Sequence, residues 1–472
     1  MSDIPAMSLT EVADAIQAKA VSSVEATQAC IDQVAAWQPK VNAFVSFDAE
    51  DALAQAKAAD DDLAAGKVRG PLHGVPLAHK DLFYRTGKRV TCASKILGDL
   101  TPDYDATVLR RLADAGALHL GGLNMSELAM GAAGRNEHFG HCRNPWNPDH
   151  ITGGSSSGSG AAVASRMAFG ALGTDTGGSI RIPSTMCGIV GIKGTFGRVS
   201  RRGVMPLSYS LDNAGPMTRT VQDCARMMGI VAGADPDDPS TANEPVPDYE
   251  GQLANASVKG VRIGVPTSYF YDDVAPTVRA ALEASLDVYR VQGAEIVEVD
   301  VPDMEVYRDL CNVVLKVEAA NIHADWLRTR GNEYSTEVRA RIEGGLYIPG
   351  VRYLQAQRLR GEHVTAFCNQ VFDVCDVLHT PGLPIEVPTL TDSDAAVGEN
   401  ALAINEKLAW CMRAMNYLGL PGLAVPCGFS GNGLPVSQQL VGPPFSEDLL
   451  FEVGHAYQRE TDWHTKAPVL PS

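Results

Sequence analysis

One short tract limits the folds open to this chain more than any other feature of its sequence. Residues 153–160 read Gly-Gly-Ser-Ser-Ser-Gly-Ser-Gly, with no other residue type among them. Such a composition is typical of a flexible linker, which lies between polar segments and joins two separate cores. Here the tract runs directly into residues 161–164, Ala-Ala-Val-Ala, which favour the start of a helix. We therefore expect a structured turn rather than a spacer.

A second turn of small residues follows after a strand-like run. Residues 173–183 read Gly-Thr-Asp-Thr-Gly-Gly-Ser-Ile-Arg-Ile-Pro. Glycine allows backbone conformations and close approaches that other residues resist. Two serine-bearing glycine turns on either side of a helix and a strand therefore indicate a functional site.

Three other kinds of site fit these residues less well. Residues 154–158 satisfy the Gly-x-Ser-x-Gly pattern of a nucleophile elbow, but that elbow follows a buried strand and the preceding residues read as a loop. Residues 188–195 only resemble a phosphate-binding loop. His138, His141 and Cys142 lack a second cluster of ligands, so surface or packed side chains are the favoured interpretation and no metal is expected.

Helical stretches and apolar strands alternate along the chain, which argues for an α/β architecture. Residues 261–266 and 294–301 read as strands on either side of a helix over 274–292, a βαβ unit. Residues 303–375 read as mostly helical, and strand signals return after them. We expect one domain with a helical insertion. Further expected elements are helices over 105–115, 126–133 and 446–460 and strands over 117–123, 168–174, 377–381, 422–427 and 436–441.

Composition excludes several classes of protein. Hydrophobic residues make up 45% of the 472 residues, which rules out a mainly disordered chain. The net charge of −17 disfavours nucleic acid as a partner, because like charges repel. No apolar run is long enough to span a membrane, and the start of the chain lacks the features of a signal peptide. Ten cysteines scattered singly fit reduced thiols, so we expect a soluble, cytoplasmic protein without disulfides.

Three segments together resemble the amidase signature family. They are residues 74–81, Gly-Val-Pro-Leu-Ala-His-Lys-Asp, the tract 153–160, and residues 177–181, Gly-Gly-Ser-Ile-Arg. The resemblance extends from Pro71 to Asp223 and resumes weakly near the C-terminus. It implies a single large α/β domain whose mixed central sheet is covered by helices on both faces.

This resemblance and the element pattern divide the chain into five expected segments. They are 1–65, an N-terminal helical segment packed on the core; 66–245, the core that carries the family motifs; 246–302, a βαβ continuation; 303–375, a helical insertion at the substrate pocket; and 376–472, strands and a helix that complete the sheet.

The resemblance also implies a Ser–Ser–Lys catalytic triad that forms an acyl-enzyme. Carried onto matching positions, Ser179 is the nucleophile, Ser155 the bridging serine, preceded by a cis peptide bond, and Lys80 the base. A lysine is a base only when neutral, so burial among apolar neighbours must lower its pKa by several units. His79 is an alternative base, but neighbouring residues of a strand point to opposite faces, which favours Lys80.

The glycine turn before the nucleophile has its own chemical use. Consecutive glycines let backbone N–H groups converge on one point, where the oxyanion of a tetrahedral intermediate would be stabilised. The expected donors are the N–H groups of Thr176, Gly177, Gly178 and Ser179. The supporting residues expected around them are Ser156, Asp175 and Arg181, the last two as an ion-pair brace, with Met130 and Gly131 in the substrate pocket.

Two functions follow from the resemblance. The leading one is a serine hydrolase that cleaves the C–N bond of a small or aryl amide, with esters and carbamates as further candidates. The alternative is the glutamine-hydrolysing A subunit of an aminoacyl-tRNA amidotransferase. Such subunits usually carry an acidic residue upstream of a segment like residues 416–421, whereas residues 409–415 contain no acid, which favours a stand-alone enzyme.

The expected partners are few. They are a small-molecule amide substrate and, in a homodimer, a second copy of the chain; a monomer is equally open, and no cofactor, nucleic acid or membrane is expected. Arg413 would select an anionic substrate if it reached the pocket, but a surface arginine on a helix is the favoured interpretation.

Overall fold

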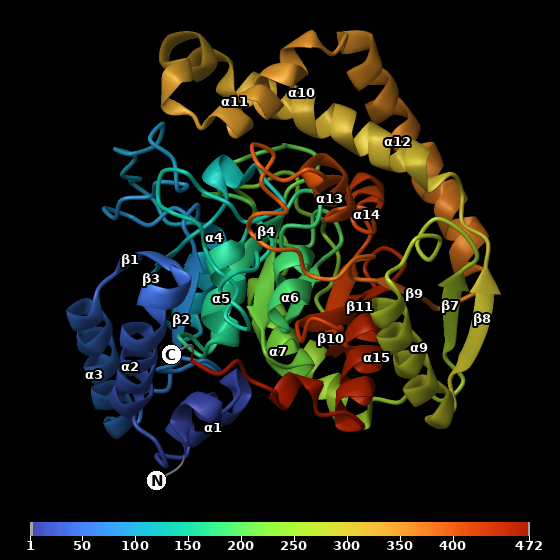
Figure 1. Cartoon of the computed structure of the whole chain (residues 1–472). Helices are drawn as coiled ribbons and strands as arrows, with labels where there is room; N and C mark the ends of the chain where they lie inside the picture. Colours follow the sequence, from blue (N-terminus) through green and yellow to red (C-terminus); the bar gives the residue numbers. More distant parts are fainter. Residues whose placement is uncertain (1–2, 471–472) are drawn as a thin grey trace.

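A single sheet of eleven strands runs through the computed structural model, which describes residues 3–470 (Figure 1). The strand order is β1-β3-β2-β4-β6-β5-β10-β11-β9-β7-β8. The strands are β1 (Phe44–Phe47), β2 (Pro76–Lys80), β3 (Leu118–Leu123), β4 (Gly170–Asp175), β5 (Val190–Lys193), β6 (Asn213–Thr218), β7 (Arg262–Pro266), β8 (Glu295–Val299), β9 (Val377–Pro381), β10 (Gly422–Phe429) and β11 (Pro435–Val441).

The sheet is mixed and covered on both faces. Strand β2 pairs in parallel with β3 and β4, and β7 pairs in parallel with β8 and β9, whereas the strands between them are antiparallel. Every residue of β2, β4, β5, β6 and β9 is buried, so neither face of the central strands meets solvent. The expected single α/β domain with a mixed sheet is confirmed.

Fifteen α-helices surround the sheet in the described part of the chain. They are α1 (Leu9–Gln17), α2 (Ser23–Val41), α3 (Ala49–Ala64), α4 (Thr107–Asp114), α5 (Ser157–Ala164), α6 (Arg181–Cys187), α7 (Val221–Val231), α8 (Tyr249–Gln252), α9 (Pro276–Val291), α10 (Met304–Arg330), α11 (Thr336–Glu343), α12 (Gly350–Phe372), α13 (Ala401–Lys407), α14 (Arg413–Leu418) and α15 (Glu447–Arg459).

Helices α10, α11 and α12 form the insertion that the sequence predicts. They lie between β8 and β9 in the chain, yet these two strands belong to the same end of the sheet, where both flank β7. Figure 1 shows the insertion as a separate helical layer above α13 and α14. The chain therefore passes from β8 into this helical layer and then re-enters the sheet at β9. The layer faces the ends of the strands that carry the site residues described below.

The serine–glycine tract lies in the core, as its helical continuation indicates. Helix α5 begins at Ser157, and all eight residues of the tract are buried. Gly158 shows why the tract contains no larger residues: a Cβ there would lie 2.3 Å from the carbonyl oxygen of Ala43. The linker interpretation is therefore excluded.

The expected helix over residues 126–133 is wrong. Only a short 3-10 turn, Glu127–Ala129, forms there, and Leu128 has a positive φ of 53°. The backbone of this segment forms hydrogen bonds with the serine–glycine tract instead of forming a helix. Ser126 N donates to the Ser155 carbonyl at 3.0 Å, and Gly154 N donates to the Ala132 carbonyl at 2.7 Å. Tertiary contacts have overridden a local preference for helix.

Two further findings concern the chain as a whole. All ten cysteines are free, and nine of them are buried. Among the helices of residues 3–470, none combines the length and apolar character that crossing a bilayer requires.

Candidate active site

Lys80 is the last residue of β2, and its ammonium group is enclosed. Its Nζ donates to Ser155 Oγ at 2.7 Å and to Thr174 Oγ1 at 2.8 Å, and the side chain is 1% exposed. Burial lowers the pKa of Lys80 to about 7, although the nearby charges of Asp212 and Asp175 act in the opposite direction. A substantial share of this lysine is therefore neutral near pH 7, as a general base must be.

The glycine turn that carries Ser155 is fixed against the second glycine turn and against β4. The peptide bond between Gly154 and Ser155 is cis, as the resemblance implies, and the serine is fully buried. Ser156 N donates to the carbonyl oxygen of Ser179 at 3.3 Å, which ties the first turn to the second. The hydroxyl of Ser156 accepts from Thr174 N and donates to Thr174 O, both at 3.3 Å, so it fixes the turn against β4.

Ser179 lies at the boundary between the core and a cavity. It is partly exposed and lines that cavity, whereas Lys80 and Ser155 are enclosed behind it. Its hydroxyl makes no hydrogen bond to any residue between 3 and 470, so the proton relay from Ser179 to Ser155 stays a prediction.

The turn before Ser179 differs from expectation at one residue. Gly178 N donates to Asp175 Oδ1 at 2.7 Å, so this N–H is engaged by a carboxylate and does not face a substrate oxygen. The N–H groups of Thr176, Gly177 and Ser179 donate to no residue of the described range. These three groups, rather than all four of the turn, are the candidates for an oxyanion hole.

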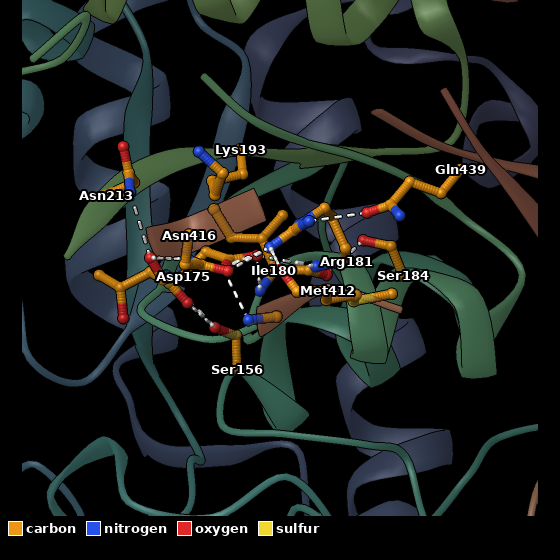
Figure 2. A network of polar contacts seen from close by, with 12 residues as sticks. Ser156, Asp175, Ile180, Arg181, Ser184, Lys193, Asn213, Met412, Asn416 and Gln439 are labelled. Atoms are coloured by element: carbon orange, nitrogen blue, oxygen red, sulfur yellow. Dashed lines mark hydrogen bonds and ion pairs between the residues drawn. The ribbon is translucent and has the colours of Figure 1, made fainter. Parts of the chain in front are cut away.

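Asp175 and Arg181 form a buried bidentate ion pair beneath this turn (Figure 2). Arg181 Nε and Nη2 each donate to the carboxylate at 3.0 Å, and both residues are 0% exposed. Burial alone would raise the pKa of Asp175, but the Arg181 charge and its hydrogen bonds outweigh this and hold that pKa below its usual range. The pair braces the turn, because Asp175 also accepts from the N–H groups of Gly178 and Ile180.

Two side chains that the sequence does not indicate complete this brace. Asn416 Oδ1 accepts from Arg181 Nη2 at 2.6 Å, and its Nδ2 donates to Asp175 Oδ1 at 2.8 Å. Gln439 Oε1 accepts from Arg181 Nη1 at 2.7 Å. Asn416 belongs to α14 and Gln439 to β11, both more than two hundred residues further along the chain than Arg181. Both amides are buried, and a buried amide needs hydrogen-bond partners, but the sequence does not show which residues these are.

The cavity in front of Ser179 has a volume of about 340 Å³. Met130 and Gly131 line it, together with residues of the helical insertion and of α13, and their place in a substrate pocket stays a prediction. The lining residues are Ala129, Met130, Gly131, Ala132, Thr176, Gly177, Ser179, Ile182, Leu207, Asn312, Leu315, Lys316, Arg341, Leu402, Asn405, Glu406, Ala409 and Arg413.

This lining corrects one expectation and adds a residue to another. Arg413 is a cavity residue and not a surface arginine, because the first turn of α14 points toward the glycine turn. The stretch 409–415 does lack an acid, but Glu406, one helical turn earlier, lines the cavity. The absence of an acid in that stretch therefore does not leave the cavity without a carboxylate.

The competing residues are engaged elsewhere. His79 Nδ1 accepts from Leu172 N at 3.1 Å, and burial lowers the pKa of His79 to about 3. His138 Nε2 lies 3.0 Å from Glu127 Oε1, and His141 Nδ1 accepts from Asn136 N. Within the described residues, no group of three or more potential metal ligands comes together.

Known proteins resemble this chain both in sequence and in fold. The model of the family Amidase matches residues 25–451. The A subunit of the glutamyl-tRNA(Gln) amidotransferase of Roseiflexus sp. (strain RS-1) is 43% identical, over 98% of both chains.

Two solved structures extend the comparison. One is a chain from a structure described as an unexpected vestigial protein complex that reveals the evolutionary origins of an s-triazine catabolic enzyme. That chain is 33% identical to this one, with a TM-score of 0.89, and the match covers 99% of this chain and 100% of that chain. The A subunit of the glutamyl-tRNA(Gln) amidotransferase of Thermotoga maritima is 28% identical with a TM-score of 0.82, and covers 100% of this chain and 99% of that chain.

Proposed function

This chain belongs to the amidase signature family, and from that membership we propose that it hydrolyses the side-chain amide of glutamine as the A subunit of an amidotransferase. The observation that carries the proposal is the similarity to curated amidotransferase A subunits over nearly the full length of both proteins. It favours the alternative function over the small or aryl amide that the sequence placed first.

The chemistry of the proposed reaction uses the geometry around Lys80. Ser179 Oγ attacks the amide carbon, and its proton passes to Ser155 Oγ while Ser155 gives its own proton to neutral Lys80. The carbonyl oxygen becomes an oxyanion that the unengaged N–H groups of the turn, those of Thr176, Gly177 and Ser179, stabilise. The relay then returns the proton to the leaving nitrogen, the C–N bond breaks and ammonia departs from an acyl-enzyme.

Deacylation repeats these steps with water. Water takes the place of Ser179 as the attacking oxygen and gives its proton to the relay. The C–Oγ bond breaks, Ser179 recovers its proton and the carboxylic acid product leaves. Lys80 is neutral at the start and at the end of each cycle, so no net proton is consumed by the relay.

The volume and the polar side chains of the cavity are consistent with glutamine as the substrate. A volume of about 340 Å³ is at the lower end of small-molecule sites. Glu406 offers a carboxylate to the ammonium group of an amino acid, and Asn312 and Asn405 offer amide groups that donate and accept.

A second candidate is a stand-alone hydrolase of another small amide. It is favoured by Ala409, which stands in the cavity wall within the stretch where amidotransferase A subunits usually carry an acid.

One experiment separates the two candidates. The chain is purified alone and together with the co-expressed partner subunits of an amidotransferase, and ammonia release is followed with glutamine, anilides and simple aliphatic amides. We expect glutamine hydrolysis that rises in the complex and is lost in Ser179→Ala. A monodisperse, partner-free chain that hydrolyses anilides or aliphatic amides and leaves glutamine intact would overturn the amidotransferase proposal.

A further inference from the structure

Arg413 packs against the turn that precedes the nucleophile. Its Cγ lies 3.4 Å and its Nε 3.7 Å from the point where a Cβ on Gly177 would stand. The side chain also lines the cavity that Ser179 faces. Because Gly177 is two residues from Ser179, and all three residues line one cavity, the Arg413 side chain and the candidate nucleophile face the same space.

The guanidinium group of Arg413 has no partner in the described part of the protein. Two other arginines of the site region are saturated: Arg181 binds Asp175, and Arg360 donates to the carbonyl oxygens of Tyr417 and Ser210. The guanidinium group of Arg413 donates no hydrogen bond to any residue in the range 3–470. An arginine has five N–H donors, and those of Arg413, which is half-buried in the cavity wall, are open to a ligand in the cavity.

The other charges around the cavity do not neutralise it. Arg341 of α11 is paired with Glu337 at 2.7 Å, and Lys316 of α10 adds another positive charge. Glu406 of α13, the carboxylate among the lining residues, lies 3.6 Å from Arg308.

The balance of these charges favours an anion. Burial lowers the pKa of Arg413, and the charges of Arg341 and Arg308 act in the same direction. A chain with a net charge of −17 thus presents an unneutralised cation beside its candidate nucleophile. A negative group from outside the protein is the missing partner.

We propose that Arg413 is a specificity-determining residue that binds a carboxylate on the acyl part of the substrate. The preferred substrates are then short amides whose carboxylate stands a few carbon atoms from the scissile carbonyl, as in glutamine and the half-amides of dicarboxylic acids. A planar guanidinium can donate two parallel hydrogen bonds to a carboxylate, which orients the acyl chain as well as binding it. This inference rests on amide hydrolysis at Ser179 and narrows its substrate class, whether or not a partner protein is required.

The test compares charged and neutral amides of matched length. Wild type, Arg413→Met and Arg413→Lys are assayed with malonamate, succinamate, glutaramate and glutamine, and with neutral butyramide. Methionine keeps much of the side-chain volume and removes the unpaired charge, so the fold is preserved. Arg358→Ala is the control, because Arg358 is exposed on α12 and pairs only with Glu362 among the described residues.

The expected result is a change in KM confined to the charged substrates. Loss of a charged hydrogen bond should raise KM for the carboxylated amides about 10- to 100-fold in Arg413→Met. The kcat for those substrates and all constants for butyramide should change little, because the contact binds substrate and transition state alike. Arg413→Lys should recover part of the affinity, and Arg358→Ala should match wild type.

Other outcomes separate the failure of this inference from that of the proposed function. If wild type hydrolyses butyramide as well as succinamate, or if Arg413→Met slows both equally, Arg413 does not read a carboxylate although the amidase activity stands. If no amide is hydrolysed, the inference is still tested by labelling Ser179 with a fluorophosphonate. Succinate should then protect wild type and not Arg413→Met; protection that is absent or equal in the two would overturn the inference.

Discussion

The amine of Lys80 lies 2.7 Å from the hydroxyl oxygen of Ser155, and both side chains are buried from solvent. A charged lysine in this position would donate to Ser155 and leave it no base. Because burial lowers the pKa of Lys80 to about 7, the neutral amine that accepts a proton from Ser155 is populated at ordinary pH. Lys80 can therefore accept the proton of Ser155 only after its ammonium group has been deprotonated.

This relationship predicts the pH dependence of turnover. The kcat/KM should rise as pH increases through about 7, where Lys80 deprotonates, and should level off above it. Lys80→Met should remove this rise and lower kcat/KM about 10²- to 10⁴-fold, the usual contribution of a general base. The measurement is a pH–rate profile of wild type and variant on one neutral amide. His79→Gln is the neighbouring control, and a profile in which this variant loses the rise while Lys80→Met keeps it would reassign the base.

Ser179 is predicted to be the residue that becomes acylated. Ser179→Ala should abolish both amide hydrolysis and covalent labelling by a fluorophosphonate, since it removes the attacking oxygen. Ser155→Ala keeps that oxygen and loses only the bridge to Lys80, so it should label slowly rather than not at all. Mass spectrometry of the labelled peptide checks the site, and full labelling of Ser179→Ala at another serine would refute the assignment.

The buried pair of Asp175 and Arg181 is predicted to be a structural requirement. Asp175→Asn or Arg181→Met alone should destabilise the fold by roughly 3–5 kcal/mol, because each leaves a buried partner unsatisfied. The double variant should lose less than the sum of the two, since no lone charge remains. Urea unfolding at pH 7 measures these differences. Additive losses would mean that the two side chains do not stabilise one another.

The same pair predicts how stability responds to acid. The pKa of Asp175 is held below its usual range in the folded protein, so this carboxylate stabilises the fold above its ordinary pKa. As the pH falls below about 4, the unfolded chain takes up the proton first, and the contribution is lost as the pH approaches the folded pKa. Asp175→Asn should therefore flatten the fall in stability between about pH 4 and the acid limit, measured as the midpoint of urea unfolding against pH.

The catalytic candidates were accessible from the sequence because their signals are local. Lys80, Ser155 and Ser179 each stand in a short stretch whose glycines and small residues restrict the backbone, and the structure brings the first two into contact. The central strands on both sides of the insertion match short apolar runs in the sequence, because they are buried on both faces of the sheet.

The other residues around the site could not be predicted from the sequence, because their positions depend on contacts between distant segments. Asn416 and Gln439 meet Arg181 only after α14 and β11 have packed against α6, and nothing in their own surroundings marks them. Arg413 is misread for the same reason: the pattern of a short helix does not tell which side will face a cavity. The lost helix at residues 126–133 shows that hydrogen bonds to a distant turn can outweigh local propensity.

Gly178 is predicted to be essential for the shape of the turn, although its N–H is not free for a substrate. Its φ is +124°, and a Cβ there would lie 2.7 Å from Ile182 Cδ1 and 3.0 Å from the Met412 sulfur. Gly178→Ala should therefore move the turn and weaken the hydrogen bond to Asp175. Because the neighbouring N–H groups would shift with it, we expect kcat to fall by about 10²-fold or more, as when one oxyanion donor is lost.

Gly66 supplies the matched control for this variant. Its φ of +75° is also in the region that favours glycine, but a Cβ there would meet no described atom within 4 Å. Gly66→Ala should cost about 1 kcal/mol or more of stability from backbone strain and leave kcat unchanged. Comparing kcat with the thermal midpoint of both variants separates strain in general from strain at the turn. A Gly178→Ala enzyme that loses stability and keeps its full kcat would show that Gly177 and Ser179 do not depend on the turn's geometry.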